Sequence, residues 1–380
     1  MKLYEVPTPA VLVDLDSLEE NIRRAAQLAG SRGKELWPMF KTSKSSYIAR
    51  LQVEAGAKGF LCSCVEEAEV IVGKKLAKII MLAYPVADRM KVERVIRLAE
   101  QGTRVILRID NLEQAELLEK YLKEFGARLE YCVKVDVGYG RLGVKPGDVG
   151  VFVRKLCRFS HLEFVGIATH QGHAYHAGDP SEVEKIARES ALAMDRALRA
   201  LKREGFEAEI VGAGSTPTYR FDVEEPIYTH LFPGNYVFYD RSQVLVYGSA
   251  KLENCALTLL TTFVSVPQHA GGRLAVIDAG WNYIDRELRG GIEGYGQLIE
   301  KPRSVVVRIS QEISLVETRE EAVKVGEKVR VLPNHACYTS NAADMLVAHR
   351  GDKVVGLIPL DARKKVPSFY RETGLPKVLE

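Results

Sequence analysis

The stretch RVILRIDNLEQAELLEKYLKEFGARLEYCVKVDVGYGRLG, residues 104–143, contains the repeating unit that decides the fold. The apolar runs Arg104–Ile109 and Tyr131–Val137 predict buried strands, and the amphipathic stretch Leu112–Phe125 between them predicts a helix. A glycine-bearing polar segment, Gly138–Gly143, follows the second strand directly. Two strands joined by a helix form a parallel crossover unit, so we expect a parallel sheet.

The same alternation extends in both directions from this unit. Eight apolar runs predict strands: Leu36–Phe40, Gly59–Cys64, Ile79–Ala83, Arg104–Ile109, Tyr131–Val137, Phe164–Thr169, Glu209–Val211 and Tyr228–Phe232. Amphipathic stretches that predict helices separate most of them: Val65–Val72, Asp88–Gln101, Leu112–Phe125, Val149–Phe159 and Glu182–Glu204. Eight strands and their crossovers over about 200 residues match a closed (β/α)8 TIM barrel, with a doubly wound open sheet as the alternative.

After Asp240 the sequence changes to β-rich runs with little helix between them: Ala256–Val266, Arg273–Ile277, Ser304–Val316, Lys328–Leu332 and Lys353–Leu360. This pattern predicts a mostly antiparallel β domain. We therefore expect a barrel domain at residues 1–240 and a β domain at residues 241–380. A first strand at Ala10–Asp14 belongs to the barrel or pairs with the β domain, and Ser17 with Glu20 predicts a capping box on the helix that follows.

Composition excludes several classes of partner. The 380 residues contain 53 Lys and Arg against 50 Asp and Glu, a formal charge of +3, which gives no reason to expect nucleic acid or an acidic membrane. The amino terminus shows no secretion signal, and nowhere do about 18 apolar residues run together. We expect a cytoplasmic protein with a small-molecule ligand. The six scattered cysteines are expected to be free thiols.

Lys41 follows the first predicted barrel strand at the rim, where barrels build active sites. On a strand, Trp37, Met39 and Lys41 share one face, which places an ammonium group beside apolar side chains. An amine in such surroundings loses its proton more readily, as a lysine that forms a Schiff base requires. A surface lysine at a strand end is the alternative, and Lys44 is a competing candidate.

Two segments after the last predicted strands offer groups that bind phosphate. Val211–Pro217, VGAGSTP, supplies small residues, free backbone N–H groups and two hydroxyls after a strand, which are the parts of an anion cradle. Pro233–Tyr236, PGNY, closes the next unit and is expected beside it, where the loops after barrel strands 7 and 8 commonly bind phosphate. A plain glycine turn is the alternative for the first segment.

Two further rim segments carry polar groups. Gly138–Gly143 fits G-x-G-x-x-G, but no helix is predicted directly after it, so we do not expect a dinucleotide site. Its Arg141 is expected to bind a cofactor or a substrate carboxylate, or to form a surface salt bridge. Residues 169–176, THQGHAYH, bring three histidines after a strand. Their spacing is not a standard zinc motif, so stacking on a cofactor ring or positioning a substrate competes with metal ligation.

His335 and Cys337 follow a predicted β run at i, i+2 spacing, so their side chains can point to the same side. Imidazole and thiolate together suit a zinc ion. A buried structural cysteine beside a surface histidine is the alternative.

Taken together and in this order, these segments resemble the D-threonine aldolase and D-serine dehydratase family of pyridoxal-phosphate (PLP) enzymes, which share the alanine racemase-like barrel. The resemblance covers nearly the whole chain. It rests on TPA at 8–10, KTSK at 41–44, Asp136–Gly143, His170–Tyr175, GSTPT at 214–218, PGNY at 233–236, DAG at 278–280 and Pro333–Cys337. Ser43 stands where the family usually has histidine, and Tyr338–Ser340 stands where a proline-bearing sequence is expected.

The resemblance implies roles for these residues. Lys41 carries PLP, the segment Gly214–Thr216 holds its phosphate, and His335 with Cys337 binds a divalent metal such as Zn²⁺ or Mn²⁺. The active site draws on two subunits of a homodimer. The residues expected to contact the cofactor are Lys41, Arg141, His170, Tyr175, Gly214, Ser215, Thr216, Gly234 and Asn235.

The activity implied by the resemblance is that of a lyase on β-hydroxy-D-amino acids such as D-serine, D-threonine or 3-hydroxyaspartate. PLP accepts the electrons released when a bond at Cα breaks, and the metal binds the β-hydroxyl as a Lewis acid. The result is dehydration with deamination, or retro-aldol cleavage. In the family, cysteine at the second metal position goes with dehydratases, so Cys337 favours dehydration. A PLP-dependent racemase and a non-catalytic PLP-binding protein are the alternatives.

Overall fold

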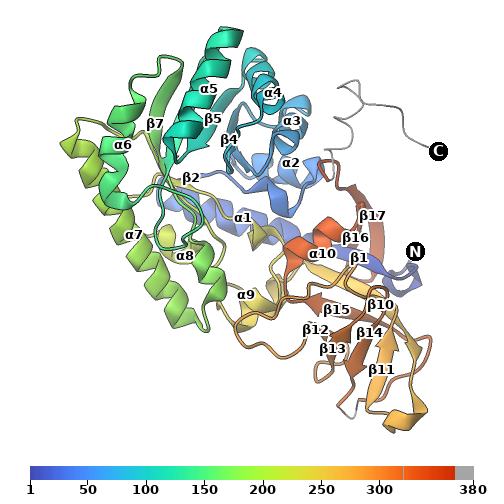
Figure 1. Ribbon diagram of the computed structural model, residues 1–380. Coiled ribbons are helices and arrows are strands. Elements are labelled where there is room, and N and C mark those ends of the chain that lie inside the picture. Colours follow the sequence, from blue (N-terminus) through green and yellow to red (C-terminus); the bar gives the residue numbers. More distant parts are fainter. Residues whose placement is uncertain (320, 364–380) are drawn as a thin grey trace.

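The computed structural model describes residues 1–319 and 321–363, which form two sheets (Figure 1). One is an eight-stranded parallel sheet with the order β2-β9-β8-β7-β6-β5-β4-β3. Its strands are β2 (Glu35–Leu36), β3 (Phe60–Cys62), β4 (Ile79–Leu82), β5 (Arg104–Ile109), β6 (Leu129–Lys134), β7 (Leu162–Ala168), β8 (Ile210–Ala213) and β9 (His230–Leu231). A bridge between Met39 and Leu61 joins the two ends. The closed (β/α)8 barrel is therefore confirmed, and the open sheet is wrong.

The first barrel strand is shorter than its sequence predicts. Strand β2 covers only Glu35–Leu36, although the N–H groups of Trp37 and Met39 still donate to carbonyl oxygens of the next segment, those of Leu231 and Pro233. The chain turns into a short 3₁₀ helix at Phe40–Thr42, and Lys41 lies in that turn. The expectation that Lys41 continues a strand face with Trp37 and Met39 is therefore wrong, although Lys41 does follow the strand at the rim.

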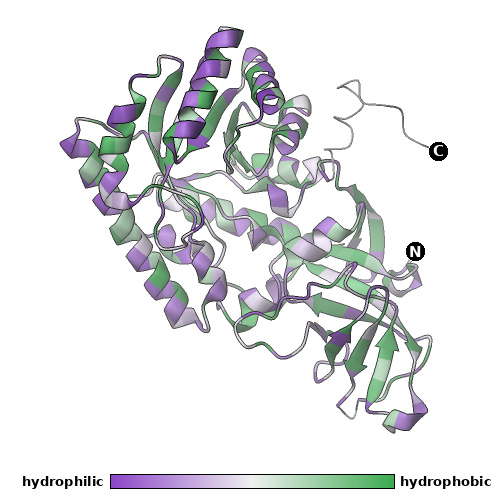
Figure 2. Cartoon of the chain, in the orientation of Figure 1, coloured by the Kyte–Doolittle hydropathy of each residue, from purple (hydrophilic) through white to green (hydrophobic). Residues whose placement is uncertain are grey.

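Helices surround the barrel with their apolar faces toward it (Figure 2). The helices are α1 (Leu15–Ser31), α2 (Ser46–Glu54), α3 (Val65–Gly73), α4 (Arg89–Glu100), α5 (Leu112–Phe125), α6 (Val149–Leu156), α7 (Pro180–Arg203) and α8 (Tyr219–Asp222). Helix α1 begins at Leu15 because the Asp14 carboxylate accepts the N–H groups of Asp16 and Ser17. The predicted capping box at Ser17 is wrong, since Asp14 already holds these donors.

The second sheet has nine strands, and six of them close into a small barrel, β11-β14-β13-β12-β15-β10, through the pairing of β10 with β11. These strands are β10 (Leu257–Ser265), β11 (Leu274–Ile277), β12 (Gly296–Leu298), β13 (Val305–Ile309), β14 (Ser314–Glu317) and β15 (Lys328–Pro333). The single run expected at Ser304–Val316 is thus the hairpin of β13 and β14. Helices α9 (Arg241–Leu245) and α10 (Ala336–Ala342) precede β10 and follow β15.

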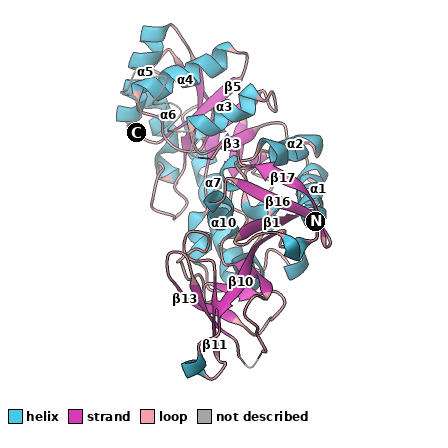
Figure 3. Ribbon diagram, turned by 90° about the vertical axis from the view of Figure 1, so that its right-hand side faces the viewer, coloured by secondary structure: helices cyan, strands magenta, loops and turns pink. Residues whose placement is uncertain are grey.

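The first strand of the chain belongs to this second sheet. Strand β1 (Ala10–Asp14) pairs antiparallel with β10 and parallel with β16 (Met345–Arg350), and β17 (Lys353–Pro359) pairs with β16. In the side view these strands lie beside α1 and α10 (Figure 3). The division of the chain at residue 240 stays a prediction.

Apolar side chains fill the barrel interior. Trp37, Leu61, Met81, Ile106 and Phe232 belong to one buried cluster, so open space remains only toward the carboxyl ends of the strands. All six cysteines are free thiols. Within residues 1–319 and 321–363, no helix is both long and apolar enough to cross a bilayer.

Replacement of Gly150 by alanine tests the contact between α6 and α7. A Cβ atom at Gly150 would lie 2.1 Å from the Ala200 carbonyl oxygen, so we expect Gly150→Ala to lower the free energy of unfolding by about 1–3 kcal/mol through overpacking. The control is Gly147→Ala, because no described heavy atom lies within 4 Å of that Cβ position. Equilibrium unfolding in urea measures both, and equal effects would contradict the packing argument.

Candidate active site

One cavity of about 240 Å³ opens at the carboxyl ends of the barrel strands, against the second sheet. It brings together most of the residues predicted from the sequence: Lys41, Arg141, His170, Tyr175, Gly214, Ser215, Gly234, Asn235, His335 and Cys337. Thr216 does not line it. The Thr216 hydroxyl instead accepts a hydrogen bond from the Gly234 N–H at 3.3 Å, so it supports the wall from behind.

The second sheet holds the turn that carries Lys41. The Ser340 hydroxyl on α10 donates to the Thr42 carbonyl oxygen at 2.7 Å, and the Asn341 amide donates to the Lys41 carbonyl oxygen at 3.2 Å. Two successive carbonyl groups of the turn are thereby fixed, while the Lys41 side chain lines the cavity.

Lys44, the competing lysine, is engaged elsewhere. Its Nζ lies 3.6 Å from the Glu67 carboxylate, which is buried and accepts both the N–H and the hydroxyl of Ser63. Lys44 lines the wider outer opening but not the inner cavity. The geometry thus favours Lys41 over Lys44 as the reactive amine.

Glycine is required in the wall expected to bind an anion. A Cβ at Gly214 would lie 2.6 Å from the Phe232 Cβ, and one at Gly234 would lie 2.8 Å from the Thr42 hydroxyl. Both loops therefore approach their neighbours too closely for any side chain. Ser215 lines the cavity wall together with these glycines, and we call Gly214, Ser215 and Gly234 the anion cup.

His170 is a neutral imidazole of defined tautomer. Its Nδ1 lies 2.5 Å from the Gly214 carbonyl oxygen, and a carbonyl can only accept, so Nδ1 carries the hydrogen. Burial, assisted by the charge of Lys134, holds the pKa of His170 well below its ordinary value. The ring consequently offers its faces and an unprotonated Nε2.

Arg141 lies at the tip of a tight turn. The Asp136 carboxylate accepts the N–H groups of Gly138 and Gly140, both of which have positive φ. The guanidinium stacks on two rings, with its carbon 4.6 Å from the Tyr139 ring centre and 5.6 Å from that of Tyr84. Within the described ranges Arg141 forms no ion pair, so the surface salt bridge is not what holds it.

The other two histidines of residues 169–176 do not join His170 in a metal cluster. Among residues 1–319 and 321–363, no group of three His, Cys, Asp or Glu side chains is arranged to hold a metal. His173 instead stacks on Tyr139 with the ring centres 6.3 Å apart.

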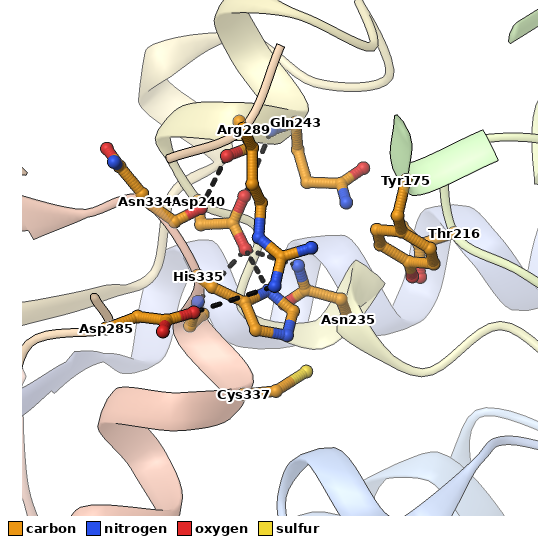
Figure 4. A network of polar contacts seen from close by, with 12 residues as sticks. Tyr175, Thr216, Asn235, Asp240, Gln243, Asp285, Arg289, Asn334, His335 and Cys337 are labelled. Atoms are coloured by element: carbon orange, nitrogen blue, oxygen red, sulfur yellow. Dashed lines mark hydrogen bonds and ion pairs between the residues drawn. The ribbon is translucent and has the colours of Figure 1, made fainter. Parts of the chain in front are cut away.

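His335 and Cys337 face the cavity from α10 and the residue before it (Figure 4). Burial alone would lower the pKa of His335, but Cys337 and Asp240 raise it to about 10, and His335 in turn keeps the pKa of Cys337 low despite its burial. Cys337 is thus biased toward thiolate, the form that binds metals. The Asp240 carboxylate lies 3.4 Å from His335 Nδ1 and orients the ring.

A loop between β11 and β12 closes one side of the cavity mouth. Arg289 on this loop lies over His335 (Figure 4) and forms ion pairs with Asp285 and Glu287. Tyr175 lines the opposite side beside Thr216 (Figure 4), and its ring packs edge-on to His335 with the centres 6.3 Å apart. Burial raises the pKa of Tyr175, so its phenol stays protonated.

Two buried cations in the cavity were not predicted from the sequence. Arg108 on β5 and Lys134 on β6 are 3% and 7% exposed and line the cavity floor. One Arg108 nitrogen, Nη2, has no hydrogen-bond partner in the described part of the chain. Burial lowers the pKa of Arg108 to about 10 and that of Lys134 well below its ordinary value. The sequence did carry a signal for both residues, because each is a charged residue inside an apolar run: RVILRI for Arg108 and YCVKV for Lys134.

Comparisons with known proteins agree with this geometry. The family model described as alanine racemase, N-terminal domain, matches residues 13–242, and the putative serine dehydratase domain matches residues 256–349. The chain is 32% identical to a 3-hydroxy-D-aspartate aldolase of Paracoccus denitrificans over 95% of this chain and 93% of that protein. The chain belongs to the D-threonine aldolase and D-serine dehydratase family. A D-threo-3-hydroxyaspartate dehydratase of Delftia sp. strain HT23 is a further relative, 28% identical over 89% of this chain and 92% of that protein.

Solved structures of this family share the whole architecture. The D-threonine aldolase from Filomicrobium marinum superposes with a TM-score of 0.87 at 28% identity, covering 96% of this chain and 97% of that one. A cysteine-to-alanine variant of D-threo-3-hydroxyaspartate dehydratase in the metal-free form gives a TM-score of 0.86 at 27% identity, covering 94% and 98%. The barrel and the second sheet are thus arranged as in this family.

Replacement of Lys134 by methionine tests the cost of the buried amine. The folded protein binds a proton at Lys134 less readily than the unfolded chain, so wild-type stability rises with pH up to the unfolded pKa of about 10.4. In protein freed of small ligands at pH 7, we expect Lys134→Met to raise the free energy of unfolding by about 1–2 kcal/mol. This gain in the free energy of unfolding over wild type should shrink as the pH approaches 10, because the unfolded wild-type chain then also loses the Lys134 proton.

The matched control for this experiment is Lys155→Met, because Lys155 is exposed on α6. Its effect should stay within about 0.5 kcal/mol at every pH. Guanidinium unfolding at pH 7 and pH 9 measures all three proteins. A destabilised Lys134→Met variant at pH 7 would contradict the argument.

Proposed function

We propose that this chain is a PLP- and divalent-metal-dependent lyase that acts on β-hydroxy-D-amino acids. One observation carries the proposal: the Lys41 side chain, the anion cup and the His335–Cys337 pair all line one cavity. The relatives support it, because they are named as aldolases and dehydratases of 3-hydroxyaspartate, D-serine and D-threonine.

The cavity residues fit PLP. Lys41 supplies the amine that binds the cofactor aldehyde, the anion cup fits its phosphate, and His170 offers a neutral ring face. The basic floor of Arg108 and Lys134 favours an anionic ligand: Arg108 Nη2 has no hydrogen-bond partner among the described residues, and Lys134 regains a proton more readily beside an anion, as the effect of Asp110 and Asp136 on its pKa shows. Arg141, Tyr175 and Asn235 complete the predicted contacts from the rim.

The donor set at His335 and Cys337 fits a divalent metal of the zinc type, with manganese as the alternative. Imidazole nitrogen and thiolate sulfur are donors that zinc prefers, and Asp240 supplies the carboxylate that commonly orients a metal-binding histidine. Two protein ligands leave coordination positions for water or substrate oxygen, as catalytic sites require.

The chemistry divides between the bound groups and the chain. PLP supplies an electron sink for the bond that breaks at Cα, and the metal supplies a Lewis acid for the β-hydroxyl. The chain positions both groups and excludes water from the floor of the cavity. The Lys41 amine, once free of the cofactor, would be the base that accepts the Cα proton, and loss of the β-hydroxyl would follow. Together with Cys337 at the second metal position, this base favours dehydration to a keto acid and ammonia over cleavage to glycine and an aldehyde.

We also propose that the chain is a cytoplasmic homodimer. Six free thiols suit a reducing compartment. Leu288 and Tyr338, which lie by the outer opening, are 54% and 40% exposed, an apolar surface that a second subunit would cover. Sedimentation velocity measures the mass in solution.

Replacement of Lys41 tests the cofactor link. Lys41→Ala should abolish the visible absorption band of bound PLP, because among the described residues the only other amine that lines the cavity is the buried Lys134. Lys44→Ala is the matched control and should keep the band, since Lys44 pairs with Glu67. Borohydride reduction and peptide mapping should place the pyridoxyl adduct on Lys41. An adduct on Lys44 or Lys134 would overturn the assignment.

Removal of the metal tests the lyase. Chelation with EDTA, His335→Ala and Cys337→Ala should each reduce activity on D-serine, D-threonine and D-threo-3-hydroxyaspartate by about 100-fold or more, since even the loss of a residue that only orients a metal ligand costs about 10–100-fold. Cys157→Ala, at an exposed thiol, should keep activity. Product analysis then decides the reaction: keto acid and ammonia mean dehydration, glycine means aldol cleavage, and inverted amino acid with no effect of EDTA means a racemase.

A further inference from the structure

We propose that Asp222 controls the anion cup through a buried chain of hydroxyl groups. When Asp222 is protonated, the Ser215 hydroxyl donates its hydrogen to a bound phosphate; when Asp222 is ionised, that hydrogen turns inward. The inference rests on the proposed function, because the cofactor phosphate is the anion in the cup. Asp222 is thus a positioning residue, which acts on the ligand only through Thr218 and Ser215.

The hydrogen-bonded chain from Ser215 to Asp222 is continuous and buried. Ser215 Oγ lies 2.8 Å from Thr218 Oγ1, and Thr218 Oγ1 lies 2.7 Å from Asp222 Oδ2. The other carboxyl oxygen, Oδ1, accepts the Gln171 amide at 2.8 Å. All four side chains are at most 3% exposed. Only Ser215 among them lines the cavity.

Each hydroxyl has a single hydrogen, so the direction of one bond fixes the next. An ionised Asp222 can only accept, and Thr218 must then donate its hydrogen to Oδ2. The hydrogen bond between Ser215 and Thr218 can then use only the Ser215 hydrogen, which Ser215 donates to Thr218. Ser215 consequently presents a lone pair to the cup, which repels an anion.

Protonation of Asp222 reverses every bond in the chain. Because Oδ1 already accepts from Gln171, the acid proton belongs on Oδ2, where it donates to Thr218. Thr218 then donates to Ser215, and the Ser215 hydrogen is free for the phosphate. One proton is taken from solvent at Asp222 and none passes to the ligand, so the relay changes orientation only.

The surroundings of Asp222 support this switch. Burial, with the nearby Glu225, raises the pKa of Asp222 to about 8, although the hydrogen bonds from Thr218 and Gln171 and the charge of Lys34, just after α1, lower it. Tyr228 also faces the carboxyl group and is uncharged, because burial raises its pKa. A phosphate in the cup adds negative charge nearby and favours the protonated acid. At neutral pH Asp222 is therefore mostly protonated, and the Ser215 hydroxyl can donate its hydrogen to a phosphate in the anion cup.

Two ligands without an aldehyde test the relay apart from any bond to Lys41. Isothermal titration calorimetry of the cofactor-free full chain compares 4-deoxypyridoxine 5′-phosphate with 4-deoxypyridoxine at pH 7 and pH 9. The ratio of their affinities isolates the phosphate, because the ring titrates in both. We expect this ratio to fall about tenfold from pH 7 to pH 9, as Asp222 passes from mostly protonated to mostly ionised.

Four variants separate the relay from a general structural role. Asp222→Asn keeps a donor toward Thr218 at every pH and should hold the ratio constant. Thr218→Val disconnects the carboxyl group and should also give a constant ratio. Ser215→Ala should lower the ratio at pH 7, where the donated hydrogen is lost, leave it no lower than wild type at pH 9, and remove its slope. The control, Glu225→Gln, removes a neighbouring charge outside the chain of hydroxyls and should keep a fall whose midpoint moves to lower pH, because Glu225 raises the pKa of Asp222.

Every outcome either supports the relay or overturns it. A constant ratio in the wild type, or a fall that persists in Asp222→Asn or Thr218→Val, overturns the relay while leaving the cofactor proposal intact. If Asp222→Asn does not fold, by circular dichroism, then Thr218→Val alone distinguishes a relay from a structural role. Failure of both compounds to bind the wild type refutes the proposed function itself.

Discussion

The buried carboxylate of Asp240 joins the last barrel loop to the second sheet, and the arrangement of the site depends on it. Asp240 is 0% exposed. It accepts hydrogen bonds from the Asn235 amide, the Gln243 N–H and the Ala336 N–H, at 2.5, 3.0 and 3.0 Å. A fully buried carboxylate is tolerated only when such donors replace water. Three segments are therefore held at fixed distances around one anion, and His335 lies within reach of the same group.

From this anchor the two halves of the cavity acquire complementary chemistry. The barrel contributes amines, a guanidinium and backbone N–H groups, which form a basic floor. The second sheet contributes a thiol, an imidazole and the loop on which Arg289 pairs with Asp285 and Glu287. A basic interior attracts an anionic ligand inward, where low dielectric strengthens each contact. The hydrogen bonds from Ser340 and Asn341 on α10 to the turn that carries Lys41 fix the two halves of the cavity relative to each other.

Much of the fold followed from sequence periodicity, and the misses have physical causes. All eight barrel strands lie within or beside the predicted apolar runs, since buried parallel strands are apolar on both faces. Helices α2 and α8 and strands β12 and β16 were missed because they are short or lack a clear period. Lys41 was found by its place after a strand, but the 3₁₀ turn at Phe40–Thr42, which the apolar run did not reveal, sets its conformation.

Among the candidate site residues, too, the sequence revealed those that local sequence marks and not those that depend on distant partners. Gly214, Ser215 and His335 were predicted because local sequence marks them, and the structure places them in one cavity while their roles stay proposals. Asp240 and Asp222 were not found, because their partners are distant in sequence or in unpredicted turns. Arg108 and Lys134 carried a local signal, a charge within an apolar run, whose meaning required the knowledge that β5 and β6 face the barrel interior.

The central place of β1 in the second sheet has a consequence for how the chain is made. Its pairing partners β10 and β16 lie far along the sequence from it, and Arg350 binds Asp16 across 334 positions. During synthesis the first strand leaves the ribosome long before these partners exist, while each barrel unit can pair with its immediate neighbour. Strand β1 must therefore stay without these partners until first β10 and then β16 have been synthesised.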